Sequence, residues 1–248
     1  MGEQWARKNN FKNVGSPTII FPQSATKLVK ETVRSKMIDH AIHEPDTLIQ
    51  VFTRTPVEGS VKTRLIPELG SRRACELHQR MTLHAVKVAT SMSSKLEIWI
   101  TPDINHAFFN AVDPNCQLKS QVGESLADRM SLALSKGLED HKKVILIGCD
   151  CPSINQAMLK RAFLELDRHE YVFIPVEDGG FSLIGSRSFS STIFHNIVWR
   201  TNQVMNQVRS NLKKNNYTWQ ELPTLWDVDE ITDYHRLSKE MPQLTHCL

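Results

Sequence analysis

The stretch "KVILIG" at residues 143–148 gives the strongest indication of the fold. Its centre, from Val144 to Ile147, is an almost continuous apolar run that contains β-branched residues. A strand without polar alternation is buried on both faces, as happens in the middle of a parallel sheet that is covered by helices. We therefore predict that this segment is a central strand of an α/β fold.

On both sides of this strand, short apolar segments alternate with longer amphipathic ones. This alternation is typical of βα units around a mostly parallel sheet. The pattern predicts strands at 47–53, 96–101, 116–121, 171–175 and 181–186, and helices at 71–92, 124–138 and 155–167. We expect one domain over residues 47–240.

The two ends of the chain lack this pattern. Residues 1–46 carry scattered lysines and arginines without a clear hydrophobic period, and we interpret them as an N-terminal extension that is poorly ordered or loosely docked. Residues 241–248 are expected to form a tail.

The composition excludes several classes of function. With 248 residues, of which 40% are hydrophobic and 23% charged, the chain has the composition of a globular protein. A net charge of +3 without long runs of like charge argues against a nucleic-acid partner. The apolar runs fall short of the roughly 20 residues of a membrane helix, so no membrane partner is expected. Five cysteines without a disulfide-rich pattern suit a reducing compartment, and we expect a cytoplasmic protein of undetermined oligomeric state.

The stretch "TRTPVEGSVKTRL" at 53–65 follows the first predicted strand and combines a glycine with nearby cations. Gly59 can adopt a positive φ that turns backbone N–H groups inward, while Lys62 and Arg64 add positive charge. Such a loop is suited to a polyanion such as diphosphate, although it lacks the second glycine of a Walker A loop. The alternative is a solvated basic loop that leads into the helix at 71–92.

Acidic residues follow later strands. Asp150 lies between a buried strand and Pro152, where its carboxylate could hold a hard divalent cation, or could simply cap a turn. Asp178 precedes Gly179 and Gly180, either as a simple turn or as a carboxylate where the backbone approaches a ligand. Because ligands of open α/β sheets bind at the carboxyl ends of the strands, the conjunction of these carboxylates with the basic loop favours a site for a metal-chelated nucleotide diphosphate.

The histidines give a weaker signal. His78 and His84 are six residues apart on the predicted helix, which is not the i, i+4 spacing of metal ligands. We expect both at the surface or at the boundary of the core.

Six motifs at compatible spacing resemble the nucleotide-diphospho-sugar transferase-like family known as rSAM/selenodomain-associated transferase 1. They are "TRTPVEGSVKTRL", "QVGESLADRM", "VILIGCDCP", "PVEDGGFSLIG", "IVWRTNQV" and "WDVDEITD", and together they cover about residues 48–237. The sequence is more distantly similar to 2-phospholactate and molybdenum-cofactor guanylyltransferases. The resemblance implies a Rossmann-like, mostly parallel sheet flanked by helices, the glycosyltransferase A-type fold.

The resemblance also implies roles for particular residues. The nucleotide and phosphate side would comprise Thr55, Gly59, Lys62, Thr63, Arg64, Gly123 and Arg129. Asp150 and Asp229 would hold Mg²⁺ or Mn²⁺, and Asp178 and Asp229 would be the catalytic carboxylates. The acceptor side would comprise Gly179, Gly180, Phe181 and Arg200.

Several residues depart from the family pattern. Phe181 stands where tyrosine is common, and Arg200 replaces a small residue in the Trp-x-Thr element. Both would border the acceptor, so the identity of the acceptor does not follow from the resemblance.

Two reactions fit the same residues, because both need a metal and cations to stabilise charge on phosphate oxygens. The family favours glycosyl transfer from a nucleoside-diphosphate sugar to a small-molecule acceptor. The alternative is nucleotidyl transfer from a nucleoside triphosphate to a phosphorylated small molecule, with release of pyrophosphate. A third hypothesis is a non-catalytic nucleotide-binding protein.

Overall fold

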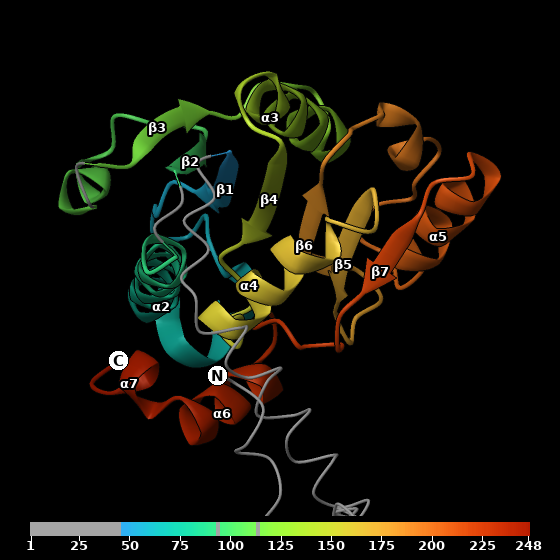
Figure 1. Ribbon diagram of the computed structural model, residues 1–248. Coiled ribbons are helices and arrows are strands. Elements are labelled where there is room, and N and C mark those ends of the chain that lie inside the picture. The colour runs from blue at the N-terminus through green and yellow to red at the C-terminus, as the bar shows by residue number, and fades with distance from the viewer. Residues whose placement is uncertain (1–45, 93–94, 113–114) are drawn as a thin grey trace, which may run out of the picture. The chain divides into compact units, whose positions relative to one another are not determined.

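The computed structural model describes residues 46–92, 95–112 and 115–248. Within this part of the chain, a seven-stranded sheet has the order β3-β2-β1-β4-β6-β5-β7 (Figure 1). Its strands are β1 (Thr47–Arg54), β2 (Lys95–Thr101), β3 (Gln117–Ser120), β4 (Lys143–Gly148), β5 (Tyr171–Pro175), β6 (Phe181–Ser186) and β7 (Trp219–Glu221). All neighbouring strands are parallel except the pairs that β6 makes with β4 and β5. The predicted α/β fold with a mostly parallel sheet is confirmed.

Helices lie between the strands and after the last one. They are α2 (Ile66–Thr90), α3 (Leu126–Asp140), α4 (Gln156–Glu165), α5 (Val204–Lys214), α6 (Ile231–Glu240) and α7 (Pro242–Thr245), with short 3₁₀ turns η1 (Thr63–Leu65), η2 (Ala107–Ala111) and η3 (Ser191–Phe194). The six predicted strands and three predicted helices are confirmed within a few residues. β7 and the helices after residue 200 were not predicted from the sequence. No described helix has the length and apolar character that a membrane span requires.

The sheet is covered on both faces because its central strands are apolar on both. In β1, Ile49 and Val51 pack into one core cluster, together with residues of α2 and α4. Leu48 and Phe52, which alternate with them, pack into a second cluster with residues of α3 and α5. This division is the period of two expected for a strand, and it produces three layers with the sheet in the middle.

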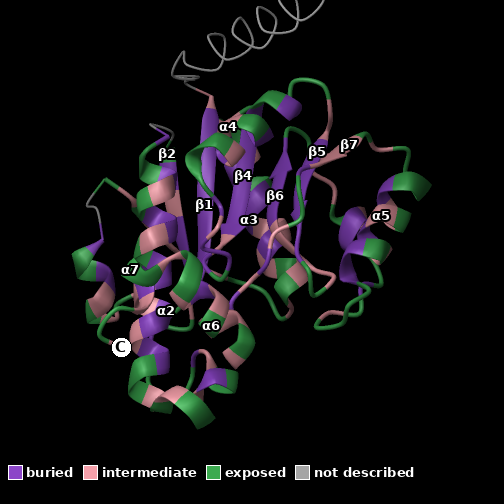
Figure 2. Ribbon diagram, turned by 90° about the horizontal axis from the view of Figure 1, so that it is seen from below, coloured by how far each residue is buried: buried purple, intermediate pink, exposed green. Residues whose placement is uncertain are grey.

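The position of β4 explains its sequence. The strand pairs with β1 on one side and with β6 on the other, and Val144 to Ile147 are at most 4% exposed. Figure 2 shows the central strands as buried along their length. The prediction of a doubly covered central strand is confirmed.

Local signals fix where the helices begin. Ser125 and Asp128 form a capping box at the start of α3, in which each side chain accepts a hydrogen bond from the other residue's backbone N–H. The side chain of Asn155 caps α4 by accepting from the N–H of Met158 at 3.1 Å. The chain therefore leaves β3 and β4 through short loops that keep the following residues at the carboxyl edge of the sheet.

A third core cluster lies where α2, α6 and α7 meet. Leu65 and Leu77 pack there with Trp226, Val228 and Leu244, all of them buried. The end of the chain thus contributes a short helix and a buried leucine, although residues 241–248 were expected to form a tail. The predicted extension, residues 1–46, lies outside the described residues except for Asp46.

Candidate functional site

The basic loop is fixed between β1 and α2 by buried side chains on both sides of its cations. Val61 is 3% exposed and Leu65 is fully buried. Between them, Lys62 adopts a left-handed conformation with φ 48° and ψ 42°, immediately before η1. A non-glycine residue in this region is uncommon and is held there by its surroundings. The loop therefore presents Lys62 in a defined direction.

The ammonium group of Lys62 is buried against an acidic partner. Nζ lies 2.6 Å from Oδ1 of Asp150 and donates a hydrogen bond to the carbonyl oxygen of Val228, also at 2.6 Å. Burial by itself would lower the pKa of Lys62, but the charge of Asp150 and the hydrogen bond to it raise the pKa above its ordinary value. Lys62 is therefore a permanent cation that links the basic loop to two other segments.

Asp150 follows β4 at the edge of the sheet, with its side chain 54% exposed. Burial would raise the pKa of this carboxyl group, whereas the charges of Lys62 and His78 bring it below the ordinary value. Asp150 is ionised at neutral pH, and its exposed surface faces the pocket described below.

The late acidic segment, residues 226–230, lies beside Asp150 because its backbone forms hydrogen bonds with neighbouring loops. Leu225 N–H donates to the carbonyl oxygen of Pro175 at 3.0 Å, and Val228 N–H donates to that of Asp150 at 2.9 Å. These bonds place Asp227 and Asp229 at the ends of β4 and β5. The carboxylate of Asp229 forms an ion pair with the guanidinium of Arg64.

Asp227 is the carboxyl group with the largest shift in this segment. Burial, followed by the negative charges of Asp178 and Asp150, raises its pKa from 3.8 to about 6. The shift reports a concentration of negative charge at this point of the pocket.

The Asp178 turn carries the fourth aspartate of the site. Asp178 is exposed, and its Oδ1 accepts a hydrogen bond from the N–H of Gly180 at 2.8 Å. Gly179 has φ 89°, and a Cβ atom on it would lie 2.2 Å from the carbonyl oxygen of Asn202. The turn therefore packs directly against the segment that carries Arg200.

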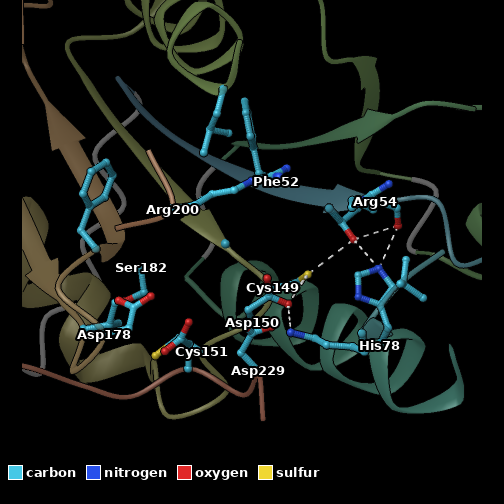
Figure 3. A pocket seen from close by; sticks show the side chains of 18 of the residues that line it. Phe52, Arg54, His78, Cys149, Asp150, Cys151, Asp178, Ser182, Arg200 and Asp229 are labelled. Carbon is cyan, nitrogen blue, oxygen red and sulfur yellow. Dashed lines mark hydrogen bonds and ion pairs between the residues drawn. The ribbon is translucent and has the colours of Figure 1, made fainter. Parts of the chain in front are cut away.

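These segments enclose one pocket of about 880 Å³ at the carboxyl edge of the sheet (Figure 3). Among its lining residues are eight of the predicted site residues: Lys62, Thr63, Arg64, Asp150, Asp178, Phe181, Arg200 and Asp229. The sheet topology thus brings together residues from the basic loop, the loop after β4, the Asp178 turn and the late acidic segment.

Other predicted residues lie outside the pocket lining. The hydroxyl of Thr55 donates to the carbonyl oxygen of Asp103 at 2.8 Å and accepts from its N–H at 3.0 Å, so Thr55 joins two loops. The carbonyl oxygen of Gly123 accepts from Nε of Arg129 at 2.9 Å, which fixes the start of α3. The remaining residues outside the lining are glycines that shape turns: Gly59, Gly179 and Gly180.

The prediction for His78 is wrong, because His78 is 3% exposed and lines the pocket. Its Nε2 lies 2.9 Å from the carbonyl oxygen of Arg54, and burial lowers its pKa. His78 lies at helical spacing from the buried Ala74, Met81 and Ala85 on α2, and this signal was available in the sequence. His84 is partly exposed and donates from Nε2 to the carbonyl oxygen of Pro152 at 3.0 Å.

His78, Cys149 and Asp150 have ligand atoms within 4.8 Å of one another, the proximity that a metal site requires. Three observations argue against a soft metal here. Nε2 of His78 faces a carbonyl oxygen and therefore carries the proton. Burial raises the pKa of Cys149 to about 12, so the thiol stays protonated. The ammonium of Lys62 already neutralises Asp150.

Comparison of the sequence with protein families gives a match over residues 82–201 to the family described as "Uncharacterized protein conserved in bacteria (DUF2064)". The matched range includes Asp150, Asp178 and Arg200. Comparison with curated proteins gives no match.

Among solved structures, one similar chain is described as a "putative nucleotide-diphospho-sugar transferase" from Desulfovibrio desulfuricans G20. It is 26% identical, with a TM-score of 0.73 over 79% of this chain and 89% of that chain. A 4-diphosphocytidyl-2C-methyl-D-erythritol synthase from Anaerococcus prevotii has a TM-score of 0.53 at 8% identity, over 79% of this chain and 97% of that one. CMP:2-keto-3-deoxy-manno-octonic acid synthetase complexed with CTP has a TM-score of 0.50 at 10% identity, over 80% and 99%.

The α/β fold is thus similar to that of the putative nucleotide-diphospho-sugar transferase from Desulfovibrio desulfuricans G20. The resemblance to nucleotide-diphospho-sugar transferase-like proteins, expected from the six motifs, is confirmed by this structure and by the DUF2064 match over residues 82–201.

Proposed function

We propose that this protein is a metal-dependent transferase with a nucleotide-activated donor, and that it moves a sugar from a nucleoside-diphosphate sugar to a small acceptor. One observation carries the proposal: the basic loop and the carboxylates Asp150, Asp227 and Asp229 line the same pocket at the carboxyl edge of the sheet. Cations and carboxylates in one pocket suit a metal-chelated diphosphate, because the cations bind phosphate oxygens and the carboxylates bind the metal.

The carboxylates fit a hard divalent cation. Asp150 is ionised and half exposed, and the raised pKa of Asp227 reflects burial and the nearby negative charges of Asp178 and Asp150. A divalent cation would relieve this repulsion. We assign Asp150 and Asp229 as the residues that would hold Mg²⁺ or Mn²⁺, with Asp227 beside them. When bound, the metal would supply Lewis-acid stabilisation of negative charge on the diphosphate.

The chain's own cations have a complementary role. Lys62 and Arg64 are paired with Asp150 and Asp229. When a nucleotide binds, its diphosphate replaces these carboxylates as the partner of the two cations, so the cations neutralise the leaving nucleoside diphosphate. Asp178, exposed at the opposite side of the pocket, is positioned to accept a proton from an acceptor hydroxyl.

Nucleotidyl transfer is the second candidate, because the same pocket could bind a nucleoside triphosphate. In that reaction a substrate phosphate attacks the α-phosphorus, and Lys62 and Arg64 would neutralise pyrophosphate. The structural similarity to the 4-diphosphocytidyl-2C-methyl-D-erythritol synthase and to the synthetase complexed with CTP supports a shared fold and leaves this reaction as the alternative.

Isothermal titration with nucleosides, nucleoside diphosphates, triphosphates and sugar nucleotides, with and without Mn²⁺, tests the proposal. We expect Mn²⁺-dependent binding of diphosphates, and we expect EDTA to abolish it. Arg64→Met should weaken diphosphate binding about tenfold and leave nucleoside binding unchanged, since a charge-assisted hydrogen bond is worth roughly 1.5–3 kcal/mol.

Arg72→Met is the matched control, because Arg72 is exposed on α2, pairs with Glu76 and lies outside the pocket lining. Binding of diphosphates that is independent of the metal, or equal losses in the two variants, would contradict the proposal. A sugar nucleotide that binds more tightly than the matching triphosphate would favour glycosyl over nucleotidyl transfer.

A further inference from the structure

We infer that Arg200 is a specificity-determining residue that binds an anionic group, a carboxylate or a phosphate, on the second substrate. The inference rests on the proposed function, because it assigns the donor to the basic loop and the second substrate to the opposite side of the same pocket. It goes further by naming the chemical class of the acceptor.

The first observation is that Arg200 has no partner. Arg200 lines the pocket, yet its guanidinium makes no hydrogen bond or ion pair with any residue in the described part of the chain. Lys62 and Arg64, in the same pocket, are both paired with carboxylates. Figure 3 shows the Arg200 side chain extended into the pocket toward Phe52. An arginine that reaches into a cavity lined by four aspartates without pairing with any of them remains available for an anionic ligand.

The second observation is that the backbone holds Arg200 in a left-handed conformation, with φ 63°. For a residue with a Cβ atom, this conformation costs roughly 1–2 kcal/mol, and it persists where the surroundings impose it. Asparagine or glycine would adopt it at lower cost. The arginine at this position therefore has a conformational cost that its own contacts do not offset.

The chain is anchored on both sides of Arg200, at Trp199 and at Asn202. Trp199 packs edge-on against Phe181 and Phe194, with ring centroids 6.5 and 5.8 Å apart. On the other side, the backbone of Asn202 contacts Gly179 so closely that a Cβ atom there would lie 2.2 Å from its carbonyl oxygen. The guanidinium therefore projects from a rigid part of the wall and is not at the end of a loose loop.

The position of Arg200 separates it from the donor side. It belongs to the wall formed by the Asp178 turn and Phe181, whereas the cations of the basic loop lie beside Asp150 and Asp229. If the diphosphate occupies the basic loop, the group that reaches Arg200 belongs to the other substrate. The planar guanidinium suits bidentate recognition of either a carboxylate or a phosphate.

The experiment uses matched acceptor analogues with the full-length protein saturated with a nucleoside diphosphate and Mn²⁺. Glycerol, glycerate and glycerol 3-phosphate share a carbon skeleton and differ in the anionic group, so their comparison also separates carboxylate from phosphate. We expect the wild-type protein to bind at least one of the two anions tenfold or more tightly than glycerol. Arg200→Met should abolish this preference, and Arg200→Lys should restore part of it.

Arg73→Met is the control for the loss of one positive charge, because Arg73 is exposed on α2 and lies outside the pocket lining; this variant should keep the preference. Wild-type binding without a preference for either anion would overturn the inference. The inference would also be overturned if Arg200→Met lost affinity for the nucleoside diphosphate and kept the anion preference, since Arg200 would then bind the donor. Neither result affects the proposed function, which fails separately if the wild-type protein binds no nucleotide.

Discussion

The ion pair between Lys62 and Asp150 is asymmetric, since the lysine side chain is 5% exposed and the aspartate side chain 54%. Removal of the aspartate charge leaves a buried ammonium, whereas removal of the lysine leaves a carboxylate that water can reach. Because Lys62 is the buried partner, the loss of the Asp150 charge is the more costly of the two changes.

We therefore predict that Asp150→Asn lowers the free energy of unfolding by about 2 kcal/mol and Lys62→Met by about 1 kcal/mol, values reduced from those of fully buried pairs because Asp150 is half exposed. The double variant should lose less free energy of unfolding than the sum of the two single losses, with a coupling energy of about 1 kcal/mol. Urea denaturation of the wild type, the two single variants and the double variant measures this coupling energy. The exposed pair Arg64 and Asp229 is the control, with a smaller expected coupling. Strict additivity at Lys62 and Asp150 would refute the buried-pair argument.

Asp227 makes stability depend on pH. Its pKa of about 6 in the folded protein exceeds the value of about 3.9 in unfolded chains, so the folded state binds more protons between these pH values. Stability contributed by the protonated form is present below pH 4 and is lost as pH rises through 6. In metal-free buffer, Asp227→Asn should raise the free energy of unfolding by about 1 kcal/mol at pH 7.5, discounted for partial exposure, and have no effect near pH 4.

Thermal or urea denaturation at the two pH values measures this difference. If Asp227→Asn raises the free energy of unfolding by the same amount at both pH values, the carboxylate charge is not responsible for the effect.

At the scale of elements, the contact between the Asp178 turn and the start of α5 holds one wall of the pocket. Gly179 has φ 89°, and its carbonyl oxygen accepts from the N–H of Met205 at 2.8 Å. A side chain at residue 179 would collide with the backbone of Asn202. The wall that carries Arg200 thus depends on a glycine in the turn.

We predict that Gly179→Ala lowers the free energy of unfolding by about 3 kcal/mol, because backbone must move to remove the overlap. Gly59→Ala is the matched control: Gly59 has a similar φ of 78°, but nothing lies within 4 Å of an added Cβ atom. Gly59→Ala should lower the free energy of unfolding by about 1 kcal/mol, the cost of the left-handed conformation alone. Chemical denaturation measures the losses of the two variants, and equal losses would contradict the packing argument.

At the scale of the whole molecule, the pocket forms because β1, β4 and β5 are parallel and end at one edge of the sheet. The basic loop and the late acidic segment are more than 160 residues apart in the chain. They meet through the hydrogen bond from Lys62 to the carbonyl oxygen of Val228 and the pair between Arg64 and Asp229. The third core cluster lies directly beneath this contact, since it contains Leu65 and Val228.

The α/β class, the central position of β4 and the edge of the sheet at which the candidate site residues lie all follow from the sequence alone. These features are local: an apolar run, a period of hydrophobic residues and a loop after each strand suffice to predict them. The helix α5 could also have been predicted, because Val204, Val208 and Leu212 repeat at four-residue spacing, but it was not. The three-residue edge strand β7 carries too little pattern to be recognised.

The burial and pairing of each charged side chain follow from the three-dimensional packing and not from the sequence. The sequence predicted Lys62, Asp150 and Arg200 at one edge of the sheet and did not distinguish their surroundings. In the structure Lys62 and Asp150 are paired with each other, whereas Arg200 has no partner within the described residues. Burial, charge pairing and pKa depend on distances of a few ångströms between segments that are far apart in the chain. Local sequence patterns do not contain those distances, because they arise from how the sheet and its two helical layers pack.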